Sequence, residues 1–209
     1  MAQKNRIKEN LKSIVIAVVI ALFVRAFIVQ AFVIPSGSME PTVKIGDHIL
    51  VNKFIYGIKI PFTQERFLQF FKPRRGDVVV FLFPLDMSKD FIKRVIATAG
   101  EKIQIINNQI YINDQPIADP WGHFEPIYAA PWLRREIDYY GPEVVPANSY
   151  FMLGDNRNDS EDSRFWGFVP NDNLIGKAMF VYFSWNSNAL SVLDIIRWSR
   201  FGKWIGRQP

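Results

Sequence analysis

A long apolar run near the N-terminus constrains this 209-residue chain more than any other feature. Residues 13–34 read SIVIAVVIALFVRAFIVQAFVI, and only Arg25 and Gln30 interrupt them. A helix rises about 1.5 Å per residue, so a run of this length can cross a hydrocarbon core of about 30 Å. Basic residues cluster in 1–12, which predicts that this N-terminus stays in the cytoplasm. The sequence therefore predicts a single-pass anchor at 13–34 in the cytoplasmic membrane, with 35–209 on its outer or periplasmic face.

Two other interpretations of this run stay open. A cleaved secretory signal would also have a basic start, and Val29-Gln30-Ala31 is a weak match to a cleavage site. A helix buried in the core of the protein is the second. Apolar residues continue past residue 31 to Ile34, however, and this favours an uncleaved anchor.

The composition excludes several classes of function. The chain has no cysteine, which rules out disulfide scaffolds, thiolate catalysis and Cys-ligated metal sites. It has two histidines, His48 and His123, which argues against a His-rich metal site or a Ser–His–Asp triad. The net charge of +5 comes from the two ends of the chain, and the body between them is mildly acidic. We therefore expect no nucleic-acid partner, because such proteins need a basic face on the folded domain.

Beyond the apolar run, the sequence predicts mainly β structure. Short runs either alternate polar with apolar residues or are rich in β-branched and aromatic residues. Asn107-Asn108 tolerates positive φ and predicts a tight hairpin between two of these runs. The predicted strands lie at 48–54, 77–83, 90–98, 102–106, 109–113, 149–155 and 176–185.

Two regions do not fit the strand pattern. The proline-rich stretch 114–148 has poor periodicity and predicts an irregular insertion within about 101–148. Residues 190–205, LSVLDIIRWSRFGKWI, have apolar residues near helical spacing with basic residues between them. They predict a short helix that either packs on the core or lies on the membrane surface.

The first of three segments that carry chemistry follows the apolar run directly. It reads S-G-S-M-E-P-T at 36–42. Ser38 is four residues from Ile34, at most about 14 Å along the chain, so it acts close to the membrane. Taken alone, a serine between glycine and proline is also an ordinary turn residue.

The second segment contains a lysine in a predicted strand at 90–98. Successive strand side chains point to opposite faces, so Phe91, Lys93 and Val95 share one face and Ile92 and Arg94 the other. A lysine on an inward apolar face is desolvated, which lowers its pKa towards neutral and makes it a candidate general base. The alternative is a surface lysine that reaches into solvent.

The third segment is the polar run 154–164, GDNRNDSEDSR. It could be an exposed acidic turn or a calcium loop, but the ligand spacing fits poorly and arginines stand among the would-be ligands. A polar network fits better, in which Asp155, Asp162 and Arg164 pair and order the loop while Ser160 supplies a hydroxyl. We therefore predict no metal here.

Together these segments resemble the type I signal peptidases, the membrane-bound leader peptidases that use a Ser/Lys dyad. The matching motifs are S-G-S-M-x-P-T at 36–42, G-D-x-I-L-V at 46–51, R-G-D-V-V-V-F at 75–81, I-K-R at 92–94 and G-D-N-R-x-x-S-x-D-S-R at 154–164. The chain departs from the familiar pattern at Asn158-Asp159 and at Phe91, where tyrosine is common.

The resemblance implies an antiparallel, barrel-like catalytic domain without metal or cofactor. Some members of this family have two spans, whereas the apolar run predicts one transmembrane helix before the domain here. It implies that Ser38 is the nucleophile and Lys93 the general base, as in other Ser–Lys arrangements. Ser36 matches a hydroxyl of the oxyanion hole, and Ser160 matches the serine that orients the lysine amine. The resemblance assigns the support of that serine's loop to Asp162 and Arg164.

The resemblance also implies the partners. They are the signal peptides of exported preproteins, cut after small-x-small sequences, and the membrane lipid. Shallow apolar pockets that accept small side chains are implied at Phe32, Ile34, Pro35, Met39, Val43, Ile49, Phe91 and Ile92. Two alternatives stay open, a self-cleaving Ser/Lys repressor relative and a non-catalytic membrane-anchored binding module. The predicted anchor argues against the first, and the presence of both Ser38 and Lys93 argues against the second.

Overall fold

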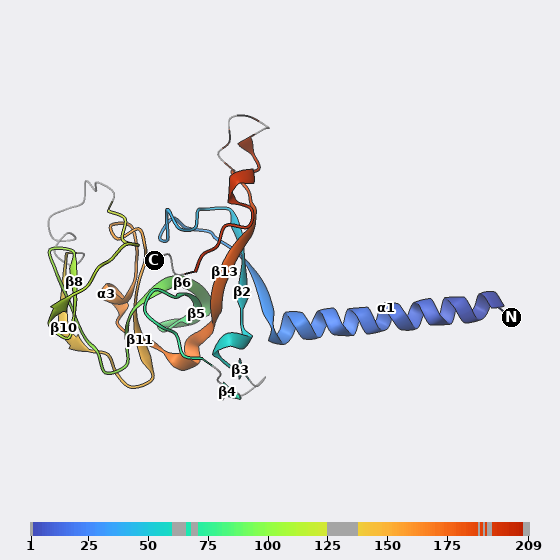
Figure 1. Cartoon of the computed structure of the whole chain (residues 1–209), viewed down its shortest axis with the longest axis horizontal. Coiled ribbons are helices and arrows are strands. Elements are labelled where there is room, and N and C mark those ends of the chain that lie inside the picture. Colours follow the sequence, from blue (N-terminus) through green and yellow to red (C-terminus); the bar gives the residue numbers. More distant parts are fainter. Residues whose placement is uncertain are drawn as a thin grey trace.

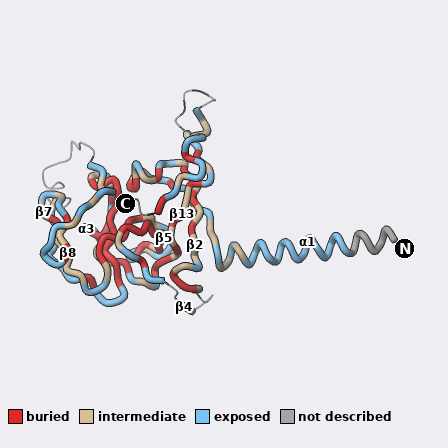
Figure 2. Tube along the Cα trace, in the orientation of Figure 1, coloured by how far each residue is buried: buried red, intermediate tan, exposed pale blue. Residues whose placement is uncertain are grey.

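The computed structural model of the chain describes residues 2–59, 66, 67, 71–124, 138–187, 189, 191 and 194–206. A long helix, α1 (Ala2–Phe27), projects from a β-rich body (Figure 1). Large apolar side chains between Leu11 and Phe23 are exposed along it, as the pale tube in Figure 2 shows. Among the described residues, no helix is both long enough and apolar enough to cross a membrane.

The helix ends earlier than the sequence predicts. It stops at Phe27, and strand β1 (Val29–Val33) follows after the single residue Ile28. The amide of Ile28 donates to Val24 and its carbonyl accepts from Lys53, so this junction is itself hydrogen-bonded on both sides. The expectation of a helix through Ile34 is therefore wrong at its end. The β-branched residues of 29–33 pair with a neighbouring strand instead.

The main sheet has seven strands in the order β1-β2-β13-β5-β6-β11-β12, and every neighbouring pair is antiparallel. The prediction of a mainly β, antiparallel domain is confirmed. The strands after β1 are β2 (Asp47–Asn52), β5 (Val78–Phe83), β6 (Asp86–Thr98), β11 (Ser149–Leu153), β12 (Val169–Pro170) and β13 (Leu174–Ser184).

A second sheet of four strands, in the order β10-β7-β8-β9, lies within the region predicted to be an irregular insertion. Asn107 and Asn108 have φ of 48° and 65°, as the predicted hairpin between β7 and β8 requires. The prediction that 114–148 is irregular is wrong for its two strands, and 125–137 lie outside the described residues. The strands are β7 (Lys102–Ile106), β8 (Gln109–Ile112), β9 (Gln115–Pro116) and β10 (Tyr139–Val144).

The remaining elements are short. A small pair of strands, β3 (Ile58–Lys59) and β4 (Arg66–Phe67), forms a sheet of its own. One helical turn, α3 (Ser163–Trp166), follows the polar loop after β11. The 3-10 turns lie at Phe54–Tyr56, Asn171–Asn173 and Trp198–Arg200.

The C-terminal segment is not the predicted helix over its described part. It forms one 3-10 turn at Trp198–Arg200, and then runs beside β13, where Gly202 and Lys203 hydrogen-bond with Val181. Gly202 has φ of 70°, which breaks a helix, and the Arg200 guanidinium pairs with the buried carboxylate of Asp47. The ion pair and the backbone bonds to β13 therefore outweigh the helical spacing of the apolar residues.

Candidate active site

The turn that carries Ser38 is held by apolar residues on both sides of it. Ile34, Met39 and Val43 are fully buried in a cluster with residues of β2, β5 and β13. Between these anchors the chain makes tight turns, in which the amide of Glu40 donates to the carbonyl of Gly37. The hydroxyl of Ser38 is thereby fixed at the edge of the core, with its side chain buried.

Lys93 comes from β6, in the middle of the main sheet, and its Nζ lies 2.6 Å from Ser38 Oγ. The strand places Lys93 and Arg94 on opposite faces, as the alternation predicts, yet both side chains are buried, at 4% and 1% exposure. β6 has strands on both of its edges and packed side chains on both of its faces. The prediction of a desolvated lysine is confirmed.

The electrostatic setting of Lys93 favours the neutral amine. Burial lowers the pKa of Lys93 from its usual 10.5 to about 8, because the charged form loses its hydration. The carboxylates of Asp162 and Glu161 raise the pKa and offset part of this effect, while the guanidinium of Arg164 lowers it further. A neutral lysine amine in hydrogen-bond reach of a serine hydroxyl can accept the proton of that hydroxyl.

Ser160 lies against Gly154, which in turn lies against the backbone of Ser38. The Oγ of Ser160 is buried and has no hydrogen-bond partner among the described residues. Gly154 lies between Ser160 and the Ser38 backbone, and a Cβ at residue 154 would overlap both Ser160 Oγ and the Ser38 carbonyl oxygen. The predicted role of Ser160 in orienting the lysine amine stays a prediction, whereas glycine is sterically required at residue 154.

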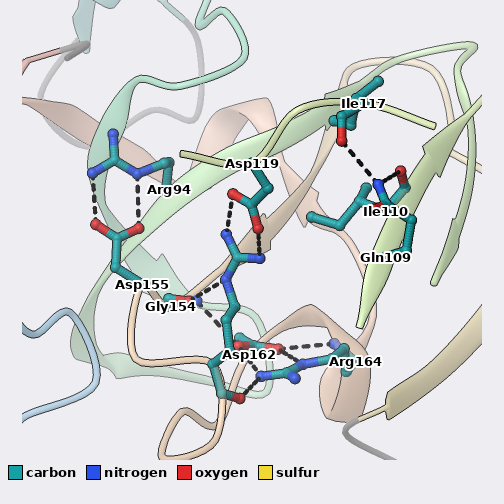
Figure 3. A network of polar contacts seen from close by, with 10 residues as sticks. Arg94, Gln109, Ile110, Ile117, Asp119, Gly154, Asp155, Asp162 and Arg164 are labelled. Carbon is teal, nitrogen blue, oxygen red and sulfur yellow. Dashed lines mark hydrogen bonds and ion pairs between the residues drawn. The ribbon is translucent and has the colours of Figure 1, made fainter. Parts of the chain in front are cut away.

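Asp162 and Arg164 form a buried ion pair next to this glycine (Figure 3). Asp162 Oδ1 accepts from Arg164 Nε at 2.8 Å, and Oδ2 accepts from the Gly154 amide at 3.0 Å. Asp162 also caps α3, since its side chain accepts from the Arg164 amide. The Arg164 guanidinium in turn donates to the carbonyl of Arg157 at 2.6 Å. These bonds close the polar loop on itself.

Asp155 does not join that pair, contrary to the predicted three-residue network. It forms a bidentate ion pair with Arg94, at 2.7 Å to Nε and 2.6 Å to Nη2 (Figure 3). The Thr42 hydroxyl donates to the same carboxylate at 2.6 Å. Asp155 thus ties the polar loop to the residue after Lys93 and to the residue that ends the Ser38 motif.

A cavity of about 390 Å³ opens beside the dyad. It is lined by Ser36, Gly37, Ser38 and Lys93, and three residues of the predicted pocket set, Pro35, Phe91 and Ile92, also line it. The other five predicted pocket residues do not line it. Ile34, Met39, Val43 and Ile49 are buried in the core, and Phe32 packs against them. Their role as pocket walls stays a prediction.

The cavity also has an acidic side that the sequence does not predict. Asp90, Asp159 and Glu161 line it, and burial raises the pKa of Asp90. No group of three or more His, Cys, Asp or Glu side chains that could hold a metal ion occurs in the described part of the chain. The cavity therefore combines apolar walls with carboxylates and the dyad at one end.

Two residues of the site were not predicted to have roles there. Arg94 binds the carbonyl of Gly76 as well as Asp155, and Gly154 makes room for Ser38 and Ser160. The sequence feature that could have indicated the role of Arg94 is an arginine next to a lysine in an otherwise apolar strand. The signal for Gly154 is a glycine where an apolar strand meets a polar loop.

The chain is similar in sequence to known signal peptidases. The family described as signal peptidase, peptidase S26, matches residues 7–185. A signal peptidase I from Pseudomonas fluorescens is 38% identical over 212 residues, covering 88% of this chain and 74% of that protein. A signal peptidase I from Leptolyngbya laminosa is 39% identical over 193 residues, covering 88% and 83%. A solved signal peptidase I from Enterococcus faecalis is 26% identical, covering 51% of this chain and 97% of that one, with a TM-score of 0.41.

The family match spans most of the chain, including Ser38, Lys93 and the polar loop 154–164. The two relatives at 38% and 39% identity are each covered over more than two thirds of their own length. The chain therefore belongs to the signal peptidases, peptidase family S26, and is a serine peptidase.

Proposed function

We propose that this chain removes the signal peptides of exported preproteins, with Ser38 as the nucleophile and neutral Lys93 as the general base. The observation that carries the proposal is the contact of 2.6 Å between Lys93 Nζ and Ser38 Oγ, made by a buried lysine. The names of the relatives support the substrate class, since they are signal peptidases. The lowered pKa of Lys93, at about 8, supports the role of a base.

The proposed reaction runs in two halves. Ser38 Oγ attacks the scissile carbonyl carbon and its proton passes to Lys93 Nζ. The tetrahedral oxyanion then collapses to an acyl-enzyme, and Lys93 returns the proton to the leaving amine. In the second half a water molecule gives a proton to Lys93 and attacks the carbonyl carbon of the ester. Lys93 returns this proton to Ser38 Oγ as the ester C–O bond breaks, which frees the serine. The Ser38 amide and the Ser36 hydroxyl are the proposed donors to the oxyanion, and Ser160 orients the amine of Lys93.

The proposed specificity is for small side chains near the cut. The cavity walls Pro35, Phe91 and Ile92 are apolar and lie beside the dyad, which supports a preference for small apolar side chains at the cut. Cleavage after small-x-small sequences follows.

The proposed location is the outer face of the cytoplasmic membrane, with 1–12 inside. The exposed apolar side chains of α1 from Leu11 to Phe23 support this, since they need a partner other than water. β1 starts two residues after α1 ends, so the body lies directly beside the end of the helix (Figure 1). Membrane lipid is therefore the second proposed partner.

The test is cleavage of a preprotein by the full chain in detergent, comparing wild type with Ser38→Ala and Lys93→Ala. The matched controls are Ser88→Ala and Lys89→Ala, which change exposed residues of β6 that do not line the cavity. We expect wild type and both controls to cut after small-x-small, and both dyad variants to be inactive but folded. Cleavage by folded Ser38→Ala at the wild-type rate would overturn the nucleophile assignment.

A further inference from the structure

A segment between the two sheets reaches the polar loop of the active site. We call residues 117–123 the clasp. Its start is fixed to β8, because the Ile117 amide donates to the Ile110 carbonyl at 2.9 Å. The side chain of Gln109 donates to the Ile117 carbonyl, also at 2.9 Å (Figure 3). The clasp therefore leaves the four-stranded sheet from a defined position.

The far end of the clasp is hydrogen-bonded to the polar loop. The His123 amide donates to the Asp155 carbonyl at 2.7 Å, and the Arg157 amide donates to the His123 carbonyl at 2.8 Å. His123 and Asn156 form a short parallel bridge. In addition, the guanidinium of Arg94 lies over the ring of Trp121, 5.0 Å from its centroid.

The centre of the clasp makes a partly buried ion pair. Both oxygens of Asp119 accept from the guanidinium of Arg157, one from Nη1 and the other from Nη2 at 2.8 Å. The side chains are 13% and 2% exposed. A Cβ at Gly122 would lie 2.6 Å from Asp119 Oδ2 and 3.0 Å from Arg157 Nη1, so the backbone closes over the pair. Removing one partner of such a pair leaves a buried charge uncompensated.

Arg157 connects the ion pair with Asp119 to the residues around the nucleophile. Its Nε donates to the carbonyl of Gly154 at 2.9 Å. Gly154 is the residue against which Ser38 and Ser160 lie, and the neighbouring Asn156 amide donates to the Ser38 carbonyl at 3.2 Å. A chain of direct contacts thus runs from Asp119 through Arg157 and Gly154 to the backbone of Ser38.

We infer that Asp119 is a positioning residue of the peptidase reaction, which acts through Arg157 to hold the Ser38–Ser160 side of the dyad. This inference rests on the proposed function, since it concerns the same site. Asp119 does not line the substrate cavity, whose apolar walls are Pro35, Phe91 and Ile92. Loss of the pair therefore lowers kcat and leaves KM nearly unchanged.

The test compares Asp119→Asn with Asp114→Asn in the full chain, using a signal-peptide substrate at a temperature where both variants are folded. Asp114 is the matched control, because it lies in the same region and pairs with Lys102 at 2.5 Å on the exposed surface. We expect kcat of Asp119→Asn to fall roughly 10- to 100-fold, as small misplacements of reacting groups do, with KM within about twofold of wild type. Asp114→Asn keeps the wild-type values.

A double-variant cycle separates positioning from general destabilisation. If Asp119 acts through Arg157, then Asp119→Asn combined with Arg157→Gln loses no more kcat than Arg157→Gln alone. Losses that multiply would overturn the inference. Gly122→Ala is the second variant, for use if Asp119→Asn does not fold, because its added methyl group pushes on the pair without removing a charge. We expect a severalfold loss of kcat at unchanged KM.

Failure of the positioning role of Asp119 gives different results from failure of the proposed peptidase function. Wild-type cleavage that depends on Ser38, together with equal kcat for Asp119→Asn and Asp114→Asn, would refute the positioning role alone. A raised KM with unchanged kcat would also refute it, because it would place Asp119 in substrate binding. Absence of any cleavage by folded wild type would refute the proposed function itself.

Discussion

Ser38 and Lys93 are 55 residues apart in the chain, yet the amine of one lies 2.6 Å from the hydroxyl of the other. Ser38 comes from a turn anchored in the core, and Lys93 from the central part of a 13-residue strand. Buried residues on both sides of Ser38 hold its turn, and strand pairing on both edges of β6 holds Lys93. The dyad is thus built into the resting fold, and its chemistry is governed by the protonation state of the lysine.

The pH dependence of cleavage should report this lysine. Since only the neutral amine can accept a proton, kcat/KM should rise with pH through a limb near the lowered pKa of Lys93, about 8. Lys93→Arg should be inactive at every pH, because a guanidinium stays protonated. The measurement is cleavage of a preprotein between pH 6 and about 10. A flat profile, or an active Lys93→Arg variant, would show that Lys93 is not the base.

Burial of Lys93 should cost stability. Its folded pKa of about 8 lies below its unfolded value of 10.5, so the unfolded chain binds more protons between these values. The cost is fully present below pH 8 and disappears as pH rises to 10.5, and it is on the order of 3 kcal/mol. Lys93→Met should therefore raise the free energy of unfolding at pH 7, with a gain that shrinks above pH 8.

Chemical denaturation of the full chain in micelles measures this gain. Lys89→Met is the control, because Lys89 is exposed on the same strand and its replacement should leave the free energy of unfolding unchanged. If Lys93→Met were destabilising at pH 7, packing around the amine would outweigh the desolvation that we infer here.

Gly154→Ala should damage the dyad directly. A methyl group at residue 154 overlaps Ser160 Oγ and the Ser38 carbonyl oxygen, so one of them must move. We expect a loss of kcat of at least about 10-fold, since a displaced nucleophile loses its alignment with the base.

Gly100→Ala is the matched control for this change. Gly100 has φ of 84° but nothing within 4 Å of the added carbon, so alanine strains the backbone there without a clash. We expect a loss of about 1 kcal/mol in stability and wild-type kcat. Equal kinetics for the two alanine variants would show that the close contact at Gly154 is not needed for turnover.

Ser160→Ala should separate activity from stability. The Ser160 hydroxyl is buried and makes no hydrogen bond among the described residues, so its removal should leave the free energy of unfolding unchanged or raise it by about 1 kcal/mol. If Ser160 orients the lysine amine, kcat should nevertheless fall, by roughly 10-fold or more. Thermal unfolding and turnover measured on the same sample check both parts, and a wild-type kcat would remove Ser160 from the mechanism.

Much of the fold could be predicted because its strands have local signals. The runs at 77–83 and 102–106 are bounded by turn residues and match β5 and β7 within one residue. The asparagine pair at 107–108 marks a turn that few other residues accept. The C-terminal segment could not be predicted in this way, since the pairing of Arg200 with Asp47 joins residues 153 positions apart.

The same distinction applies to the active site. Ser38 and Lys93 stand in recognisable motifs, and the alternation along β6 indicates an inward lysine. The partner of Asp155 could not be predicted from the polar loop alone, because the choice between Arg94 and Arg164 depends on how the strands pair. The contact of Asp119 with Arg157 is likewise set by where the second sheet docks, and not by any local pattern.

The junction between α1 and β1 contains one residue, and its amide and carbonyl are both hydrogen-bonded. The segment between the helix and the nucleophile turn is fixed in place, because β1 pairs with β2 along its whole length. If α1 lies in the lipid as proposed, Ser38 is held at a fixed distance from the membrane surface. The cleavage site of a preprotein would then be selected by two properties, the size of its side chains and its distance from the membrane.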